Sequence, residues 1–197
     1  YAHGITNTYK EAYGIFACSG ILFNHESPLR GIEFVSRKIT NTVAQIKLGL
    51  KKELRLGNLQ AKRDWGYAPE YMEAIYKIMQ LKKPDDFVIS TGESHTVEEF
   101  VKESFELVGL NWKKYVKIDK KFFRPLEVNY LRGDSSKAKS KLNWKAKTTF
   151  KKLVKIMMDE DNKRWEMFLE GKSFPWDAPL YPSESKMITR TIKKKNV

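Results

Sequence analysis

Residues 14–24 of the chain, GIFACSGILFN, are the stretch that decides its fold class. The run is almost entirely apolar, which is typical of a strand covered on both faces in a parallel sheet. The segment before it, ITNTYKEAY (residues 5–13), reads as the end of a helix that Gly14 terminates. Cys18, the only cysteine, excludes an internal disulfide and indicates a buried, inert thiol in a reducing cytoplasm.

Strand and helix patterns alternate along the rest of the chain, which predicts an α/β fold. Residues 33–48 carry apolar side chains at helical spacing, and Gly49 is a natural end for that helix. Pro69 suits the first turn of a further helix. We expect the apolar stripe of that helix to face the core; its members are Met72, Ile75, Tyr76 and Met79. The other expected elements are short strands at 53–56, 87–90 and 116–119, and helices at 97–109, 136–142 and 149–171.

The composition predicts a folded, basic protein rather than a disordered or membrane-spanning one. Of the 197 residues, 41% are hydrophobic and 13% aromatic, enough for a core, and no apolar run approaches the ~18 residues needed to cross a bilayer. The formal net charge is +13, but lysine pairs are spread along the whole chain without a nucleic-acid-binding motif. We therefore expect neither nucleic acid nor membrane as a partner, and expect particular arginines to hold a small anion such as a diphosphate.

Several motifs of cofactor and catalytic sites are missing from the sequence. It contains no G-x-G-x-x-G or G-x-x-x-x-G-K-[ST] loop for phosphates and no G-x-S-x-G nucleophile motif. His3, His25 and His95 are far apart in the sequence, so no metal site is expected. Taken alone, the residue patterns therefore establish an α/β domain with two polar loops.

Five longer segments resemble the GDP-mannose 4,6-dehydratase family, within the extended short-chain dehydrogenase superfamily. They are ILFNHESPLRG (21–31), FVSRKIT (34–40), LGNLQAKRDWGYAPEYMEAIY (56–76), FVISTGESHTVEEFV (87–101) and FFRPLEVNYLRGDSSKAKSKLNWK (122–145). The resemblance runs from Tyr1 to about residue 160. RDW alone marks the wider group of nucleotide-sugar dehydratases and epimerases, whereas NHESP-x-RG together with LGN-x-x-AKRDWG is much narrower.

The resemblance implies the carboxy-terminal part of a doubly wound NAD(P)-binding fold plus a smaller α/β domain for the sugar nucleotide. Residues 1–23 and 63–92 would belong to the nucleotide-binding domain, and residues 24–62 and 93–170 to the substrate domain. Residues 171–197 would form a tail, either an extended arm or a disordered end. Because the first strands of the large sheet would lie upstream, we expect FACSGILF (16–23) to expose a sheet edge and an apolar face.

The resemblance also implies a reaction on GDP-mannose. In the family, NADP takes a hydride from C4 of the mannose, water is eliminated across C5 and C6, and the hydride returns to C6. The product is GDP-4-keto-6-deoxymannose, a precursor of fucose, and the full-length enzyme is expected to be a homodimer or homotetramer. The family's Y-x-x-x-K pair, threonine and glutamate fall upstream of Tyr1, so we expect no catalytic residue in this chain and no activity from the chain alone.

The binding residues, by contrast, match positions of this sequence. Asn24 corresponds to a residue on the sugar nucleotide, and His25 and Arg30 to contacts with NADP; the family often has a second arginine where this chain has Leu29. Substrate positions are matched by Val35, Lys38, Leu56, Gly57, Lys62, Arg63, Arg124 and Glu127. Among these, Leu56 and Gly57 would face guanine, Arg63 and Arg124 the diphosphate, and Glu127 the ribose hydroxyls. Asp64 could fix the rotamer of Arg63, and Trp65 could anchor the turn.

Each assignment has a structural alternative. Asn24 could cap a turn, His25 could be a loop histidine with its hydrogen bonds satisfied, and Arg30 and Lys38 could be surface charges. The remaining structural alternatives are a purely structural Arg63–Asp64 pair, an Arg124–Glu127 salt bridge, and a helix cap at Asp134. For the whole protein, the alternatives are a related GDP-sugar epimerase or reductase, or a truncated module that binds nucleotide sugar without catalysis.

Overall fold

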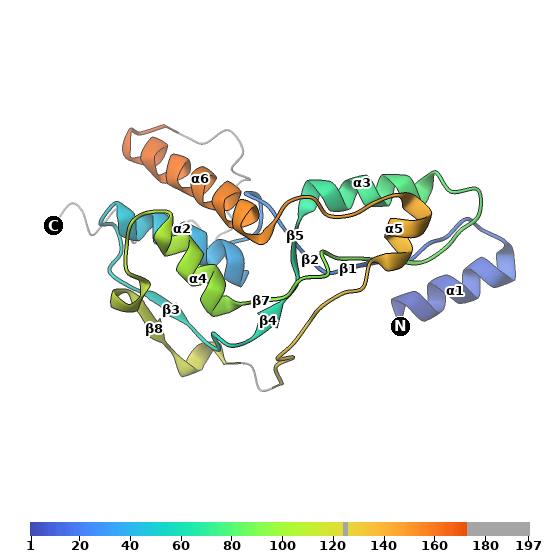
Figure 1. The fold of residues 1–197 in the computed structure, drawn as a ribbon, viewed down its shortest axis with the longest axis horizontal. Coiled ribbons are helices and arrows are strands. Elements are labelled where there is room, and N and C mark those ends of the chain that lie inside the picture. Colours follow the sequence, from blue (N-terminus) through green and yellow to red (C-terminus); the bar gives the residue numbers. More distant parts are fainter. Residues whose placement is uncertain (124–125, 173–197) are drawn as a thin grey trace. The chain divides into compact units, whose positions relative to one another are not determined.

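The structure is a computed structural model that describes residues 1–123 and 126–172. Helices alternate with short strands along the chain, which confirms the predicted α/β class (Figure 1). The residues form two compact units. Unit 1 comprises Tyr1–Ser27, Gln60–Val97 and Leu126–Leu153. Unit 2 comprises Pro28–Leu59 and the described parts of Glu98–Pro125 and Val154–Val197. Which unit binds cofactor and which binds substrate stays a prediction.

Unit 1 contains three strand pairs. Strand β1 (Gly20–Leu22) pairs in parallel with β6 (Phe87–Ile89), and β2 (Asn24–Glu26) pairs in parallel with β5 (Trp65–Tyr67). The third pair, of β4 (Lys62–Arg63) with β7 (His95–Thr96), is antiparallel. The apolar stretch 14–24 thus contributes the predicted parallel strand, but that strand is only three residues long and a second strand opens at Asn24.

Three helices belong wholly to unit 1. Helix α1 (Ala2–Tyr13) ends at Gly14, whose φ of 63° is left-handed and suits glycine, as the sequence predicts. Helix α3 (Ala68–Met79) has its proline in the first turn, also as predicted. Helix α5 (Ser136–Leu142) contacts both α3 and β6. These contacts enclose the core of the unit.

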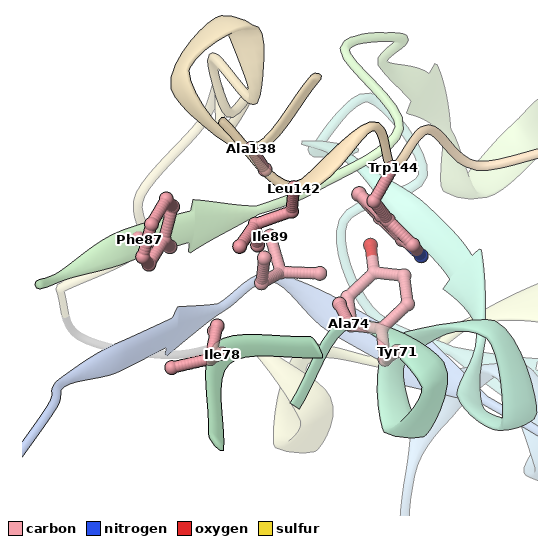
Figure 2. Close-up of a cluster of buried hydrophobic side chains, with 8 residues drawn as sticks. All are labelled: Tyr71, Ala74, Ile78, Phe87, Ile89, Ala138, Leu142 and Trp144. Atoms are coloured by element: carbon pink, nitrogen blue, oxygen red, sulfur yellow. The ribbon is translucent and has the colours of Figure 1, made fainter. Parts of the chain in front are cut away.

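Figure 2 shows how side chains from these elements converge in that core. The ring of Trp144 meets the ring of Tyr71 edge-on, with centroids 5.9 Å apart, and its Nε1 donates a hydrogen bond to the carbonyl oxygen of Glu70 at 2.9 Å. The cluster comprises Tyr71, Ala74 and Ile78 of α3, Phe87 and Ile89 of β6, Ala138 and Leu142 of α5, and Trp144. A buried indole whose N–H is satisfied contributes area without an unpaired donor.

The predicted core face of α3 is right for only one of its four residues, Ile75, which packs against the core cluster. Met72, Tyr76 and Met79 are 50%, 67% and 59% exposed, whereas Ala74 and Ile78 are almost completely buried. Apolar residues lie on both sides of this helix, so helical spacing predicts the helix but does not select its buried side. The packed side is the one that carries Tyr71, Ala74 and Ile78, which share a buried cluster with residues of α5 and β6.

The stretch leading into β1 is also more exposed than a buried strand would be. Ile15, Phe16 and Ile21 are each more than 40% exposed, which confirms the expected apolar face on residues 16–23. Cys18, predicted to be buried, is only partly shielded.

Unit 2 is built on one parallel strand pair and three helices. Strand β3 (Leu54–Leu56) pairs with β8 (Val116–Ile118), and both short strands lie where the sequence predicts them. Helix α2 (Val35–Lys47) contacts β3. Helices α4 (Val97–Glu106) and α6 (Phe150–Leu169) begin in unit 1 and continue into unit 2. Two 3₁₀ turns, η1 (Trp112–Lys114) and η2 (Lys120–Phe122), flank β8.

The helical faces predicted for unit 2 are confirmed. The buried apolar residues are Ile39, Val43, Ala44 and Ile46 of α2, Phe100, Val101 and Phe105 of α4, and Val154, Met157 and Met158 of α6. None of the helices in the described part of the chain has the length and apolar character required to cross a bilayer.

The corrected face of α3 predicts different costs for two neighbouring substitutions. Ile78→Ala should lower the free energy of unfolding by about 2–5 kcal/mol, because it leaves a cavity in a packed core. Met79→Ala, on the exposed side, should change it by less than about 0.5 kcal/mol. Urea unfolding followed by circular dichroism measures both. A larger loss for Met79→Ala would restore the face predicted from the sequence.

Candidate functional site

Two predicted substrate residues, Arg63 and Glu127, form an ion pair in unit 1. Arg63 ends β4, and its Nη2 donates to Glu127 Oε1 at 3.1 Å. Its Nη1 donates to the carbonyl oxygens of Val128 at 2.6 Å and of Lys62 at 2.8 Å. The two charged side chains are only 13% and 19% exposed. The structure therefore brings together residues 64 positions apart and holds the Arg63 guanidinium in one orientation.

Asp64 does not fix Arg63, contrary to the prediction. Its fully buried carboxylate accepts hydrogen bonds from the backbone N–H groups of Thr91 (2.9 Å), Gly92 (3.0 Å) and Gly133 (3.2 Å). The hydroxyl of Thr91 donates a fourth, at 2.6 Å. A buried carboxylate is costly unless such donors satisfy it. Asp64 therefore links its own segment to those of Thr91–Gly92 and Gly133. The orientation of the Arg63 side chain is fixed instead by Glu127 and the carbonyl oxygen of Val128.

The segments around Asp64 depend on glycine. Gly92 has a φ of 81°, which L side chains rarely adopt. A Cβ on Gly133 would lie 2.3 Å from the Cβ of Ser90, so no side chain fits there. Trp65 is 2% exposed and stacks on Phe150 with ring centroids 6.1 Å apart, so its buried ring can anchor the turn after Arg63.

Of the other predicted residues of unit 1, Lys62 precedes Arg63 on β4 and is exposed, whereas Asn24 and His25 lie on β2 directly beside β5. Asn24 is in register with Trp65 and His25 with Gly66. The imidazole of His25 stacks on the ring of Tyr71, with centroids 5.5 Å apart, and its Nδ1 lies 2.9 Å from the carbonyl oxygen of Phe23. Because a carbonyl only accepts, Nδ1 carries the proton. The ring is thus held in one orientation and one tautomer.

In unit 2, Lys38 lies over an aromatic ring. Its ammonium nitrogen is 3.4 Å from the centroid of the Phe122 ring, a cation–π contact. Burial lowers the pKa of Lys38, the charge of Lys51 lowers it further, and Asp119 acts in the opposite direction. Burial also lowers the pKa of Lys51. Partial burial of two ammonium groups concentrates positive charge that water screens poorly.

Leu56 and Gly57 lie beside the same aromatic residue. The side chain of Leu56 is 3% exposed, and its carbonyl oxygen accepts from the N–H of Asp119 at 2.8 Å. A Cβ on Gly57 would lie 2.5 Å from the carbonyl oxygen of Phe122, so this position requires glycine. The structure therefore brings Lys38 and Gly57 against Phe122, with Leu56 directly before Gly57 and bonded to Asp119.

The remaining predicted residues have simple placements. Val35 begins α2 and is half-buried. The guanidinium carbon of Arg30 lies 3.6 Å from the centroid of the Phe34 ring. Asp134 accepts from the N–H of Ser136 at 2.9 Å, which lowers its pKa, but the N-cap residue of α5 is Ser135, one position later than the sequence predicts. Arg124 and the tail from residue 173 lie outside the described residues.

Sequence reasoning missed two polar networks. In unit 1, Glu70 of α3 accepts from the N–H of Lys147 (3.0 Å) and from the N–H and hydroxyl of Thr148 (3.0 and 2.8 Å). In unit 2, Arg37 pairs with the fully buried Asp161 at 2.8 Å. A local signal for the second existed, because Asp161 follows Val154 and Met158 on the apolar stripe of α6. Within residues 1–123 and 126–172, no three His, Cys, Asp or Glu side chains are grouped to hold a metal ion.

Comparison with known proteins gives a consistent result at the level of sequence. The family model described as GDP-mannose 4,6 dehydratase matches residues 1–157. The chain is 60% identical over 160 residues to GDP-mannose 4,6 dehydratase 1 of Arabidopsis thaliana, covering 81% of this chain and 44% of that protein. It is 48% identical over 178 residues to the Homo sapiens GDP-mannose 4,6 dehydratase, covering 82% of this chain and 48% of that protein. The chain thus spans less than half the length of either relative.

Solved structures agree at the level of the fold. RMD from Pseudomonas aeruginosa, complexed with NADPH, superposes with a TM-score of 0.75 at 18% identity, over 83% of this chain and 54% of that chain. The dTDP-glucose 4,6-dehydratase of Bacillus anthracis, in complex with NAD, superposes with a TM-score of 0.72 at 20% identity, over 84% and 50% of the two chains. These likenesses confirm the predicted α/β fold.

The four hydrogen bonds to Asp64 predict that this residue stabilises unit 1. Asp64→Asn should lower the free energy of unfolding by at least about 2 kcal/mol, because an amide cannot accept from four donors and one of its ends is itself a donor. Asp134→Asn is the matched control and should cost less than about 0.5 kcal/mol, because Asp134 is exposed and its printed hydrogen bond, from the N–H of Ser136, can be accepted by an amide oxygen as well. Equal stabilities of the two variants in urea unfolding would contradict the role assigned to Asp64.

Proposed function

Because this chain belongs to the GDP-mannose 4,6-dehydratase family, we propose that it forms the sugar-nucleotide-binding part of an enzyme that converts GDP-mannose to GDP-4-keto-6-deoxymannose. The observation that carries the proposal is the match of residues 1–157, with the narrow NHESP-x-RG and RDWG segments inside it. The enzyme is a lyase of nucleotide-sugar metabolism, on the route to GDP-fucose. We propose that it acts in the cytoplasm as a homo-oligomer.

The Arg63–Glu127 pair supports a diphosphate and ribose site. Three of the five N–H donors of Arg63 are used within the chain, and the other two have no partner among the described residues. A guanidinium with two donors left and its orientation already set suits a phosphate oxygen pair. The second carboxylate oxygen of Glu127 can accept from a ribose hydroxyl. Lys62 is exposed beside the pair and adds positive charge.

Lys38 and Gly57, which lie against Phe122, support a second set of contacts with the sugar nucleotide. Lys38 supplies the positive charge, held at a distance of 3.4 Å over the Phe122 ring. Because the Leu56 side chain is buried, this residue and Gly57 would meet the guanine through their backbone at the end of β3. Val35, Asn24 and Arg124 complete the proposed substrate residues.

We propose NADP as the cofactor, with His25 and Arg30 as its contacts in this chain. The donor types fit the phosphates of a dinucleotide: Arg30 is a guanidinium supported on an aromatic ring, and His25 is an imidazole with a fixed tautomer. Reversible hydride transfer is the chemistry that a bound nicotinamide supplies to such a reaction. The NADPH and NAD complexes among the solved structures of this fold favour a nicotinamide cofactor.

The family's base is expected outside this chain, and the tyrosine at the core is a poor substitute. Burial raises the pKa of Tyr71, and the negative charges of Asp64, Glu70 and Glu26 raise it further. A tyrosine base needs the opposite shift, because its phenolate must form near neutral pH. The chain's proposed contribution is therefore binding rather than proton transfer.

This division of labour predicts that the 197-residue chain alone produces no keto sugar from GDP-mannose and NADP. General-base catalysis alone contributes about 10²–10⁴-fold to the rate, and the base is expected in the missing half. A family-length enzyme, made by joining this chain to the amino-terminal half of its Arabidopsis thaliana relative, should therefore turn over. Turnover by the purified chain would contradict the assignment. A folded family-length enzyme that binds GDP but never turns over would instead favour the non-catalytic module.

The diphosphate assignment predicts that Arg63→Lys weakens GDP binding to the family-length enzyme by at least about 30-fold, since the loss of one partner of a desolvated charge pair costs about 2–5 kcal/mol. Arg132→Lys is the matched control: Arg132 is an exposed arginine of the same unit, and the change should alter affinity by less than about twofold. Calorimetric titration measures both, with unfolding curves to verify folding. A loss below about threefold for Arg63→Lys would leave this arginine only its structural role.

A further inference from the structure

A buried arginine on α2 holds the backbone of the polar loop at residues 28–30. Arg37 Nη1 donates hydrogen bonds to the carbonyl oxygens of Pro28 at 2.6 Å and of Arg30 at 2.9 Å. The side chain of Arg37 is 10% exposed, so water competes little for these bonds. One guanidinium on a regular helix thus fixes two backbone carbonyl groups of a loop that is not part of a helix or sheet.

The other edge of that guanidinium is fixed by Asp161 on α6. Arg37 Nε lies 2.8 and 3.0 Å from the two carboxylate oxygens. The hydroxyl of Thr40 donates to the same carboxylate at 2.6 Å, and Arg164 Nη1 donates at 3.0 Å. Burial raises the pKa of Asp161, while the two guanidinium groups and the Thr40 hydroxyl act in the opposite direction. Arg37 is therefore clamped between a carboxylate on one side and two loop carbonyls on the other.

The side chain of Arg30 is oriented at its outer end as well. Its guanidinium carbon lies 3.6 Å from the centroid of the Phe34 ring, and Phe34 immediately precedes α2. The carbonyl of Phe34 accepts the N–H of Lys38 at 2.8 Å, so the ring is tied to the first turn of the helix. Both the backbone and the guanidinium of Arg30 thus take their positions from α2.

We propose that Arg37 and Asp161 are a positioning pair, which fixes residues 28–30 so that the Arg30 guanidinium is already oriented for a phosphate group of the dinucleotide. The inference rests on the cofactor role proposed above for Arg30. A donor that is ordered before binding loses less conformational entropy when the ligand arrives. Asp161 lies beyond residue 157, where the match to the family model ends, so the positioning carboxylate comes from outside the matched stretch.

Arg37→Lys separates positioning from charge. Lysine keeps a positive charge beside Asp161, but its single nitrogen cannot serve the carboxylate and both carbonyls in the geometry of a planar fork. Thr40→Val is the matched control, because it removes a hydrogen bond to the same carboxylate without touching the loop carbonyls. Asp161→Asn, which keeps the shape and one acceptor for Arg37 Nε, replaces Arg37→Lys if the lysine variant fails to fold.

Two measurements test the pair. Hydrogen exchange of the peptide covering residues 27–36 should speed up at least about tenfold in Arg37→Lys and by less than about twofold in Thr40→Val. In the family-length enzyme, titration should show NADP affinity falling about tenfold in Arg37→Lys, as in Arg30→Ala, with GDP-mannose affinity within about twofold of the unmodified enzyme. This combined result supports the proposal.

Three results would overturn it, each for a separate reason. Unchanged hydrogen exchange in Arg37→Lys would mean that the loop is held by other contacts. Faster exchange with NADP affinity unchanged, when Arg30→Ala does weaken NADP, would mean that the order of the loop does not matter for binding. If neither Arg30→Ala nor Arg37→Lys changes NADP affinity, the cofactor assignment of Arg30 fails and the positioning role falls with it.

Discussion

The carboxylate of Asp64 is the constraint on which the arrangement of unit 1 depends. It is fully buried, and an ionised group in that position is tolerated only when several donors compensate for its lost hydration. The four donors come from Thr91, Gly92 and Gly133, which lie 27, 28 and 69 positions away along the chain. If these segments separated, the Asp64 carboxylate would lose its hydrogen bonds and would be left either in water or buried without donors. Arg63, one residue earlier on β4, inherits its position from this requirement.

The same physical device recurs at Glu70 and Asp161. In each case an acidic side chain on a helix accepts several hydrogen bonds, either from a loop or from a residue that grips a loop. Loops lack a ladder of backbone hydrogen bonds, so a charged acceptor on a rigid element is an effective way to order them. The formal charge of +13 therefore says little about the interior, where a few carboxylates organise the polar loops.

Local patterns were sufficient for most elements, because their causes are local. Gly14 and Pro69 act through their own backbone preferences, and the buried faces of α2, α4 and α6 follow from one-sided apolar stripes. The buried side of α3 was predicted only for Ile75, since apolar residues lie on both sides of this helix and its contacts with the rest of the cluster decide between them. The partner of Arg63 could not be predicted for a similar reason. Asp64 is adjacent in sequence, but its side chain bonds residues 91, 92 and 133, whereas that of Arg63 bonds Glu127. A family resemblance assigns residues to a ligand; it does not say which protein atoms hold those residues still.

The methionines of α3 and α6 differ in solvent exposure, and they should therefore differ in their reactivity with oxidants. Met72 and Met79 are 50% and 59% exposed on α3, whereas Met157 and Met158 are fully buried in α6. Oxidation converts an apolar thioether into a polar sulfoxide, and exposed sulfurs react first. A mild peroxide treatment should therefore make the open side of α3 polar while leaving the buried methionines of α6 intact. Oxidation would thus reduce the apolar character of the exposed side of α3 without disturbing the core contacts of α6.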